Sequence, residues 1–221
     1  MTFRTRLFAA AGLAGALLAL AGCKTKGDIV VDDGVGIASV RGVCPAVGVP
    51  DYTGDITLFR SPGATDAGAI DVTAVLTNLR PSCNDAGAGD KVLTQVGFDV
   101  LARRTDTRGA RTVQLPYFVT VLRGGRAVIA KRLGTISLTF ADGQDRAQAH
   151  GTGSAYVDRA EATLPPEVRN RLTRKRKAGD ADAAIDPLAQ PDVRAAVARA
   201  TFEVLVGFQL DQSQLAYNAT R

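Results

Sequence analysis

The chain has 221 residues, of which 46% are hydrophobic and 22% charged, and its formal net charge is +5. This length allows one large domain or two small ones, and the apolar content is enough for a buried core. The charge is too small to indicate a nucleic-acid-binding protein. After the N-terminal apolar stretch, no segment is long and apolar enough to span a membrane.

Residues 1–22 have the organisation of an export signal. Arg4 and Arg6 form a short positive region, residues 7–20 are apolar, and Ala21 and Gly22 are the small residues that a signal peptidase requires. A transmembrane helix is the alternative. It is disfavoured because an apolar run of about 14 to 16 residues is shorter than the roughly 20 needed to cross a bilayer.

Cys23 ends the sequence Leu20-Ala21-Gly22-Cys23. This tetrapeptide resembles the lipobox of bacterial lipoproteins, which signal peptidase II cleaves before the cysteine. The resemblance implies that residues 1–22 are removed, that the Cys23 thiol carries a diacylglycerol and that a further acyl chain such as palmitate is added. Two or three acyl chains anchor a protein durably, whereas one binds only marginally. An ordinary secretory signal, in which Cys23 has no role, is the other alternative.

Lys24 follows the cysteine. In Gram-negative lipoproteins an Asp at this position favours the inner membrane, so the resemblance implies attachment to the outer membrane, with the protein facing the periplasm. Loss of Arg4 and Arg6 with the signal lowers the net charge from +5 to +3. We expect residues 23–36 to form a lipid-anchored tether and residues 37–211 to form a single domain.

From residue 37 to residue 157 the apolar side chains recur at every second position, which is typical of half-buried strands. Four segments show this alternation, with apolar residues at Ile70, Val72, Ala74 and Leu76, at Val92, Val96, Phe98 and Val100, at Tyr117, Val119 and Val121, and at Ile136, Leu138 and Phe140. Turn sequences separate them. Arg123-Gly124-Gly125-Arg126 predicts a two-residue hairpin, and Asp142-Gly143 predicts a tight turn. A longer loop is expected at residues 84–90, and another turn at residues 105–109.

The C-terminal third has a helical pattern before a last strand. Pro165-Pro166-Glu167 opens one short helix, and Pro191-Asp192 opens another that has Val193, Ala196 and Val197 on one face. We therefore expect a helical insert over about residues 164–199. Residues 202–208 alternate aromatic and β-branched side chains with other residues, which favours a strand over a helix continuing to Leu210. Residues 212–221 are polar and predict a flexible tail.

About seven or eight strands with regular turns predict a mainly β domain. We expect an antiparallel β-sandwich of immunoglobulin or fibronectin type III, with one or two short helices inserted before the last strand. The chain has no Trp and so lacks the Cys–Trp–Cys signature of true immunoglobulin domains. Cys44 and Cys83 predict a disulfide, because an exported pair meets an oxidising compartment. A metal site or a redox pair is disfavoured by the single His and by the absence of a Cys-x-x-Cys motif.

No pattern in the chain indicates a catalytic site, a metal site or a cofactor. His150 is the only histidine, and Ser154 lies about 13 Å further along the same strand, too far for a hydrogen bond. Asp32 and Asp33 lack the spacing of an EF-hand. We therefore expect His150 to be an exposed or edge-strand residue.

Residues 169–177 form the one unusual surface feature, a basic stretch with the cations Arg169, Arg171, Arg174, Lys175, Arg176 and Lys177. Such a stretch either binds anionic lipid head groups or lipopolysaccharide, at about 1 kcal/mol per charge, or is a solvated helix end. The leading hypothesis is a non-enzymatic, lipid-anchored protein that binds or scaffolds an envelope protein or an anionic envelope polymer. Anion recognition by the basic stretch is the second hypothesis, and an enzyme that uses carboxylates alone is the third.

Overall fold

A computed structural model describes residues 42–86, 89–174 and 185–221. These residues belong to one compact unit, residues 37–221. The predicted signal peptide, Cys23 and the predicted tether lie outside the described residues, and so do Lys175, Arg176 and Lys177.

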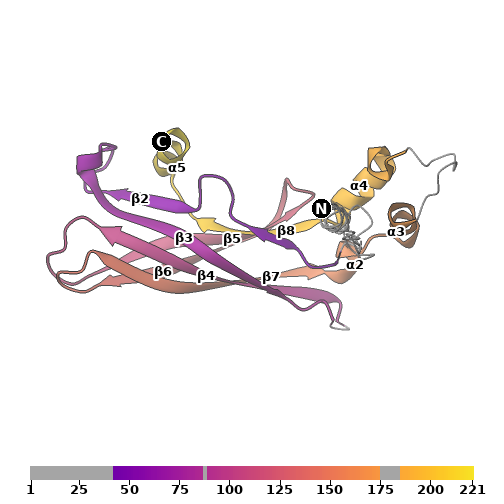
Figure 1. Ribbon diagram of the computed structural model, residues 1–221, viewed down its shortest axis with the longest axis horizontal. Helices are drawn as coiled ribbons and strands as arrows, with labels where there is room; N and C mark the ends of the chain where they lie inside the picture. Colours follow the sequence, from indigo (N-terminus) through magenta and orange to yellow (C-terminus); the bar gives the residue numbers. More distant parts are fainter. Residues whose placement is uncertain (1–41, 87–88, 175–184) are drawn as a thin grey trace, which may run out of the picture. The chain divides into compact units, whose positions relative to one another are not determined.

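The described strands form two four-stranded sheets packed face to face (Figure 1). The strands are β1 (Ala46–Gly48), β2 (Asp55–Phe59), β3 (Ile70–Cys83), β4 (Lys91–Arg104), β5 (Arg111–Arg123), β6 (Ala127–Phe140), β7 (Arg146–Asp158) and β8 (Phe202–Phe208). One sheet has the order β1-β8-β5-β6 and the other β2-β3-β4-β7. All neighbours pair antiparallel except β1 and β8, which are parallel.

The predicted alternation builds the core between the sheets. Phe98 of β4, Leu115 of β5, Phe140 of β6 and Phe208 of β8 are fully buried and belong to one apolar cluster. Each such side chain contributes about 1.5 to 3 kcal/mol relative to an exposed position. The mainly β, sandwich-like prediction is therefore confirmed, and so is the last strand, β8.

The predicted hairpin between β5 and β6 is confirmed. Gly124 and Gly125 have φ values of 63° and 75°, which side chains other than glycine rarely adopt. The turn at Asp142-Gly143 is present, with a φ of 76° at Gly143. It does not close a hairpin, because the segment from β6 to β7 passes from one sheet to the other, as does the segment from β4 to β5.

The helices are short and lie mostly between β7 and β8. They are α2 (Arg159–Ala162), α3 (Pro166–Thr173), α4 (Pro191–Ala200) and α5 (Gln212–Thr220), with 3-10 turns η1 (Ala67–Ala69) and η2 (Pro187–Ala189). The two predicted helices, α3 and α4, are confirmed. They pack through a small apolar cluster that includes Val168, Val193, Ala196 and Val197. Within the described ranges, no helix has the length and apolar character required to cross a membrane.

Residues 212–221 differ from the flexible tail that we expected, because α5 occupies most of them. The Asp211 side chain accepts from the backbone N–H of Gln214, and the backbone N–H of Asp211 donates to Oε1 of Gln214, which forms a capping box. Asn218 is buried and donates to the carbonyls of Tyr52 and Asp55, beside β2. Local capping and this long-range contact together explain why a polar sequence is helical here.

The predicted disulfide between Cys44 and Cys83 is confirmed, with the two Cα atoms 6.0 Å apart. Cys44 precedes β1 in one sheet, and Cys83 ends β3 in the other. The bond therefore joins the two layers of the sandwich directly.

Candidate functional site

The outer face of β3, β4 and β7 carries a polar surface whose order follows from the strand register. Val96, Phe98 and Val100 of β4 are buried against the core, so the residues between them face outward. Cross-strand pairing arranges the outward residues in rows, of which two are Thr73–Arg103–Arg146 and Val75–Leu101–Gln148. We call these six residues the β4–β7 hollow.

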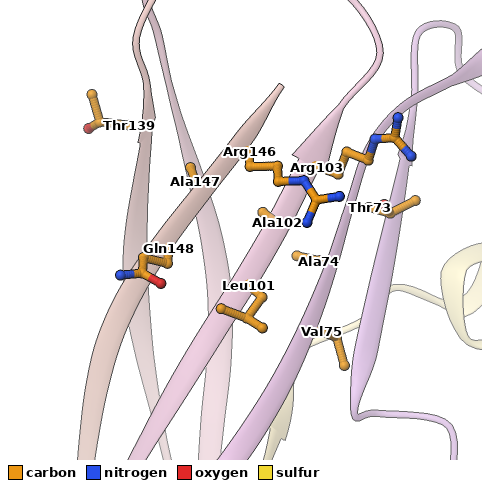
Figure 2. Close-up of a pocket in the computed structure, with 10 residues that line it drawn as sticks. All are labelled: Thr73, Ala74, Val75, Leu101, Ala102, Arg103, Thr139, Arg146, Ala147 and Gln148. Carbon is orange, nitrogen blue, oxygen red and sulfur yellow. The ribbon is translucent and has the colours of Figure 1, made fainter. Parts of the chain in front are cut away.

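The two rows line a depression of about 760 Å³ (Figure 2). Its apolar part is the adjacent pair Val75 and Leu101, which are 44% and 45% exposed. Its polar part comes from Thr73, Gln148 and two arginines, together with Thr139 of β6 in the other sheet. A depression with both kinds of lining suits a ligand or partner that presents a polar group next to an apolar one.

Arg103 and Arg146 are direct cross-strand partners. Like charges in this position destabilise a strand pair, so they are an energetic cost that the fold tolerates. Nε of Arg103 donates to Asp145 at 3.1 Å, which neutralises one of the two charges. Within the described residues Arg146 forms no ion pair, and Figure 2 shows its side chain extending from β7 over β4. The hollow therefore has a positive charge available for an anionic group.

Asp99 lies in the next row and collects three hydrogen-bond partners. Arg80 makes a bidentate contact with the carboxylate, at 2.9 and 3.0 Å, and Asn78 donates to it at 2.6 Å. Nδ1 of His150, directly opposite on β7, is 2.9 Å from Asp99. The Arg80 guanidinium, followed by His150 and Asn78, holds the pKa of Asp99 far below its usual range. Asp99 is therefore a fixed anion at neutral pH.

An irregularity in β3 brings Asn78 and Arg80 onto this face. The pairing with β4 shifts between Thr77 and Arg80, and Asn78 has a φ of 54°. Bulges of this kind redirect side chains. No local sequence signal identified Arg80, Asp99 or Asn78 as a group, because only the register between β3, β4 and β7 brings them together.

The pair of His150 and Asp99 resembles part of a catalytic triad in composition. His150 is more than half exposed, as expected for an edge-strand residue, and β7 is the last strand of its sheet. In the part of the chain that the structure describes, no hydroxyl group is hydrogen-bonded to His150. Across the same residues, no cluster of three or more His, Cys, Asp or Glu side chains is arranged to hold a metal ion.

The basic stretch is only partly described, and its described cations have partners within the chain. Arg171 of α3 forms an ion pair with Asp192 of α4 at 2.5 Å, which lowers the pKa of Asp192. Nη2 of Arg169 donates to the carbonyl of Leu164 at 3.3 Å. Arg174 also has an interaction partner. Arg171 thus contributes to the packing of α3 against α4.

Comparison with known proteins does not place the chain in a family: no family model, no curated protein and no solved structure matches it.

Proposed function

We propose that this protein is a lipid-anchored, non-enzymatic component of the bacterial cell envelope that binds another envelope component through the β4–β7 hollow. The observation that carries the binding role is the pair Arg103 and Arg146, which face each other across two strands beside exposed Val75 and Leu101. Since Arg103 is already paired with Asp145, an anionic group on a partner pairs with Arg146 and lowers the remaining repulsion between the two arginines, and this favours the bound state.

The location is supported by the N-terminal sequence and by the disulfide. The resemblance of Leu20-Ala21-Gly22-Cys23 to a lipobox implies export and lipidation at Cys23. Disulfides persist in oxidising compartments such as the periplasm, which fits the bond between Cys44 and Cys83. An outer-membrane anchor with the sandwich in the periplasm is the arrangement that we propose.

A binding role without catalysis is supported by the environment of His150 and Asp99. In a catalytic triad the histidine is the general base, and the carboxylate serves only to orient it. Here the Asp99 carboxylate is occupied by Arg80 and Asn78 instead of serving His150 alone. These contacts stabilise an ion-pair network on the sheet surface. We do not centre the proposal on the basic stretch, because Arg171 is paired with Asp192.

We also propose that the sandwich is of the immunoglobulin or fibronectin type III class. Support comes from the order in which strands change sheets. The hairpin β3–β4 lies in one sheet and β5–β6 in the other, after which β7 returns to β4 and β8 pairs with β5. The parallel pairing of β1 with β8 is a departure from a purely antiparallel sandwich.

Site-specific photo-crosslinking in cells tests the binding surface. A photoreactive residue at Gln148, on the rim of the hollow, should give a reproducible crosslinked partner, whereas the same residue at Ser137, on exposed β6, should not. The double substitution Arg103→Glu and Arg146→Glu should reduce the Gln148 product at least tenfold, about 1.4 kcal/mol. The double substitution Arg194→Glu and Arg199→Glu, at two exposed positions of α4, is the matched charge control and should leave the product unchanged.

An equally strong crosslinked product from Ser137 contradicts the proposal that the hollow is the binding surface. So does a Gln148 product that persists when Arg103 and Arg146 are both replaced by Glu. The anchor is tested separately by acyl labelling. Labelled palmitate should be incorporated into the native protein and not into the Cys23→Ser variant, and equal labelling of the two contradicts lipidation at Cys23.

A further inference from the structure

The first half of β6 is exposed although it is rich in apolar residues. Residues 127–133 are all exposed, and Val128, Ile129 and Leu133 are between 49% and 67% exposed. In its second half, by contrast, β6 places Ile136, Leu138 and Phe140 in the core. We call residues 126–133 the β6 tip. Monomeric proteins seldom leave neighbouring apolar side chains exposed without a function for them.

The β6 tip also has positive charge and no acidic residue of its own, although the Glu203 carboxylate lies beside Gly125 at its start. It contains Arg126, Lys131 and Arg132, and the sequence has no Asp or Glu between residues 126 and 140. In the described ranges, Arg126 and Arg132 form no ion pair. Nζ of Lys131 lies 4.9 Å from the centre of the Phe118 ring. The charge of the tip is therefore complementary to an anionic surface.

The edge of β6 is poorly suited to receive a further strand. The register with β5 skips Ile129, since Val121 pairs with Ala130 and Leu122 with Val128. This irregularity and the cations Lys131 and Arg132 are the features by which proteins block pairing at a sheet edge. A second copy of the chain would in addition bring cations against cations. The exposed apolar groups therefore suit a fluid surface better than a strand.

The β6 tip lies at the same end of the domain as the first described residues. Gly124, in the turn before β6, donates to the carbonyl of Thr201 at 2.9 Å. Gly42 and Cys44 line a hollow together with Thr201 and Ala200. In sequence, residues 24–41 connect this point to Cys23, so the lipid anchor that we propose is joined to the domain at the end that carries the β6 tip.

We propose that the β6 tip is a membrane contact, in which Val128, Ile129 and Leu133 enter the interfacial region of the bilayer. Arg126, Lys131 and Arg132 bind anionic lipid head groups around them. This contact rests on the proposed lipid anchor but not on the β4–β7 hollow. It orients the anchored domain on the membrane, which the tether alone does not do.

Tryptophan fluorescence tests this contact directly, because the chain has no Trp and one substitution introduces the only fluorophore of its kind. Ile129→Trp reports on the tip, and Leu215→Trp, on exposed α5, is the control. Each processed, lipidated variant is reconstituted in vesicles of phosphatidylcholine and phosphatidylglycerol with brominated acyl chains. The emission of the Ile129→Trp variant should shift to shorter wavelength and be quenched about twice as strongly as that of Leu215→Trp, or more.

The charge requirement has its own variant. Lys131→Glu with Arg132→Glu, in the Ile129→Trp background, should lower the quenching to the level seen in vesicles of phosphatidylcholine alone. Arg108→Glu, 89% exposed in the loop after β4 and outside the hollow, should not change it in the same background.

Two outcomes overturn the contact. Equal quenching of the Ile129→Trp and Leu215→Trp variants, in protein that is membrane-bound through Cys23, overturns it and leaves the anchor intact. The contact is also overturned if, in the absence of lipid, the emission of the Ile129→Trp variant shifts as the protein concentration rises, since a second copy of the chain then covers the tip. The anchor has its own readout, because acyl labelling of Cys23 is measured independently of where the β6 tip lies.

Discussion

Two arginines, at opposite ends of β7, bind loops through the same kind of hydrogen bond but differ in how deeply they are buried. Arg104, beside the segment that leads into β7, is 1% exposed, whereas Arg159, which follows β7, is only half-buried. Each donates from its guanidinium to several backbone carbonyl groups rather than to a carboxylate. Comparing the two separates the effect of burial from the effect of hydrogen bonding.

The buried arginine joins the two connections that cross between the sheets. Arg104 donates to four carbonyls at 2.7 to 2.8 Å, those of Thr107, Gly109, Ala141 and Gln144. Its guanidinium also lies 5.3 Å from the centre of the Phe140 ring. A buried charge is costly unless it is fully hydrogen-bonded, and here the carbonyl dipoles of two loops supply the compensation.

The half-buried counterpart closes one hairpin. Arg159 donates to the carbonyls of Gly89 and Asp85 at 2.9 and 3.0 Å, and more weakly to that of Asn84 at 3.5 Å. Water is able to replace these bonds when the side chain is removed, so each adds little to stability. The end of the domain near the β4–β7 hollow is thus the one that a buried side chain stabilises. Arg103 precedes Arg104 in the sequence, and Arg146 follows Asp145, whose carbonyl accepts from the Arg104 backbone N–H.

The largest effect is expected at Arg104. Arg104→Met replaces the guanidinium by an apolar group on a side chain of similar length, and it leaves four carbonyls without their donor. We expect a loss of about 4 to 5 kcal/mol in the free energy of unfolding, measured by urea denaturation. Arg103→Met, next in sequence but exposed, is the control and should change stability by less than about 0.5 kcal/mol. Equal losses in the two variants would mean that burial does not decide the role of Arg104.

The disulfide ties the two sheets at the other end, where Arg159 lies. Replacing Cys44 and Cys83 together by Ser should lower the free energy of unfolding by about 4 kcal/mol, because the unfolded chain loses a closed loop with a sequence separation of 39 residues. Denaturation with and without a reductant measures the loss. The reductant should destabilise the native protein and have no effect on the double variant. A native protein that is insensitive to reductant would show that the bond contributes nothing.

The sequence predicted the elements whose signals are local. Alternation predicted the long strands, Gly124-Gly125 predicted the β5–β6 turn, and proline at the first positions predicted α3 and α4. The disulfide followed from cysteine count and compartment. The helix α5 was missed because a polar segment of low helical periodicity relies on the cap at Asp211 and on the contact of Asn218 with distant backbone.

The candidate site was beyond sequence reasoning, because its residues are far apart in the chain. Arg103 and Arg146 meet only through the register of β4 with β7, and Asp99 meets Arg80 only after an irregularity in β3. Pattern also fails to distinguish Arg104 from Arg103. In β4 an inward-facing arginine breaks the apolar alternation, and its burial depends on carbonyls from loops whose paths are set by the tertiary fold.

The smallest effect is expected at Arg159, and it completes the comparison. Arg159→Met should cost about 1 kcal/mol of unfolding free energy, since its carbonyl partners become hydrated. The change should be local: hydrogen exchange should speed up at Asn84, whose amide bonds to Leu93 across the β3–β4 hairpin, and not at Gly143, beside the Arg104 network. Arg104→Met should show the reverse pattern before global unfolding. If Arg159→Met instead destabilises the protein as much as Arg104→Met, the hairpin at residues 84–90 carries as much of the fold's stability as the buried network, and depth is not what separates the two arginines.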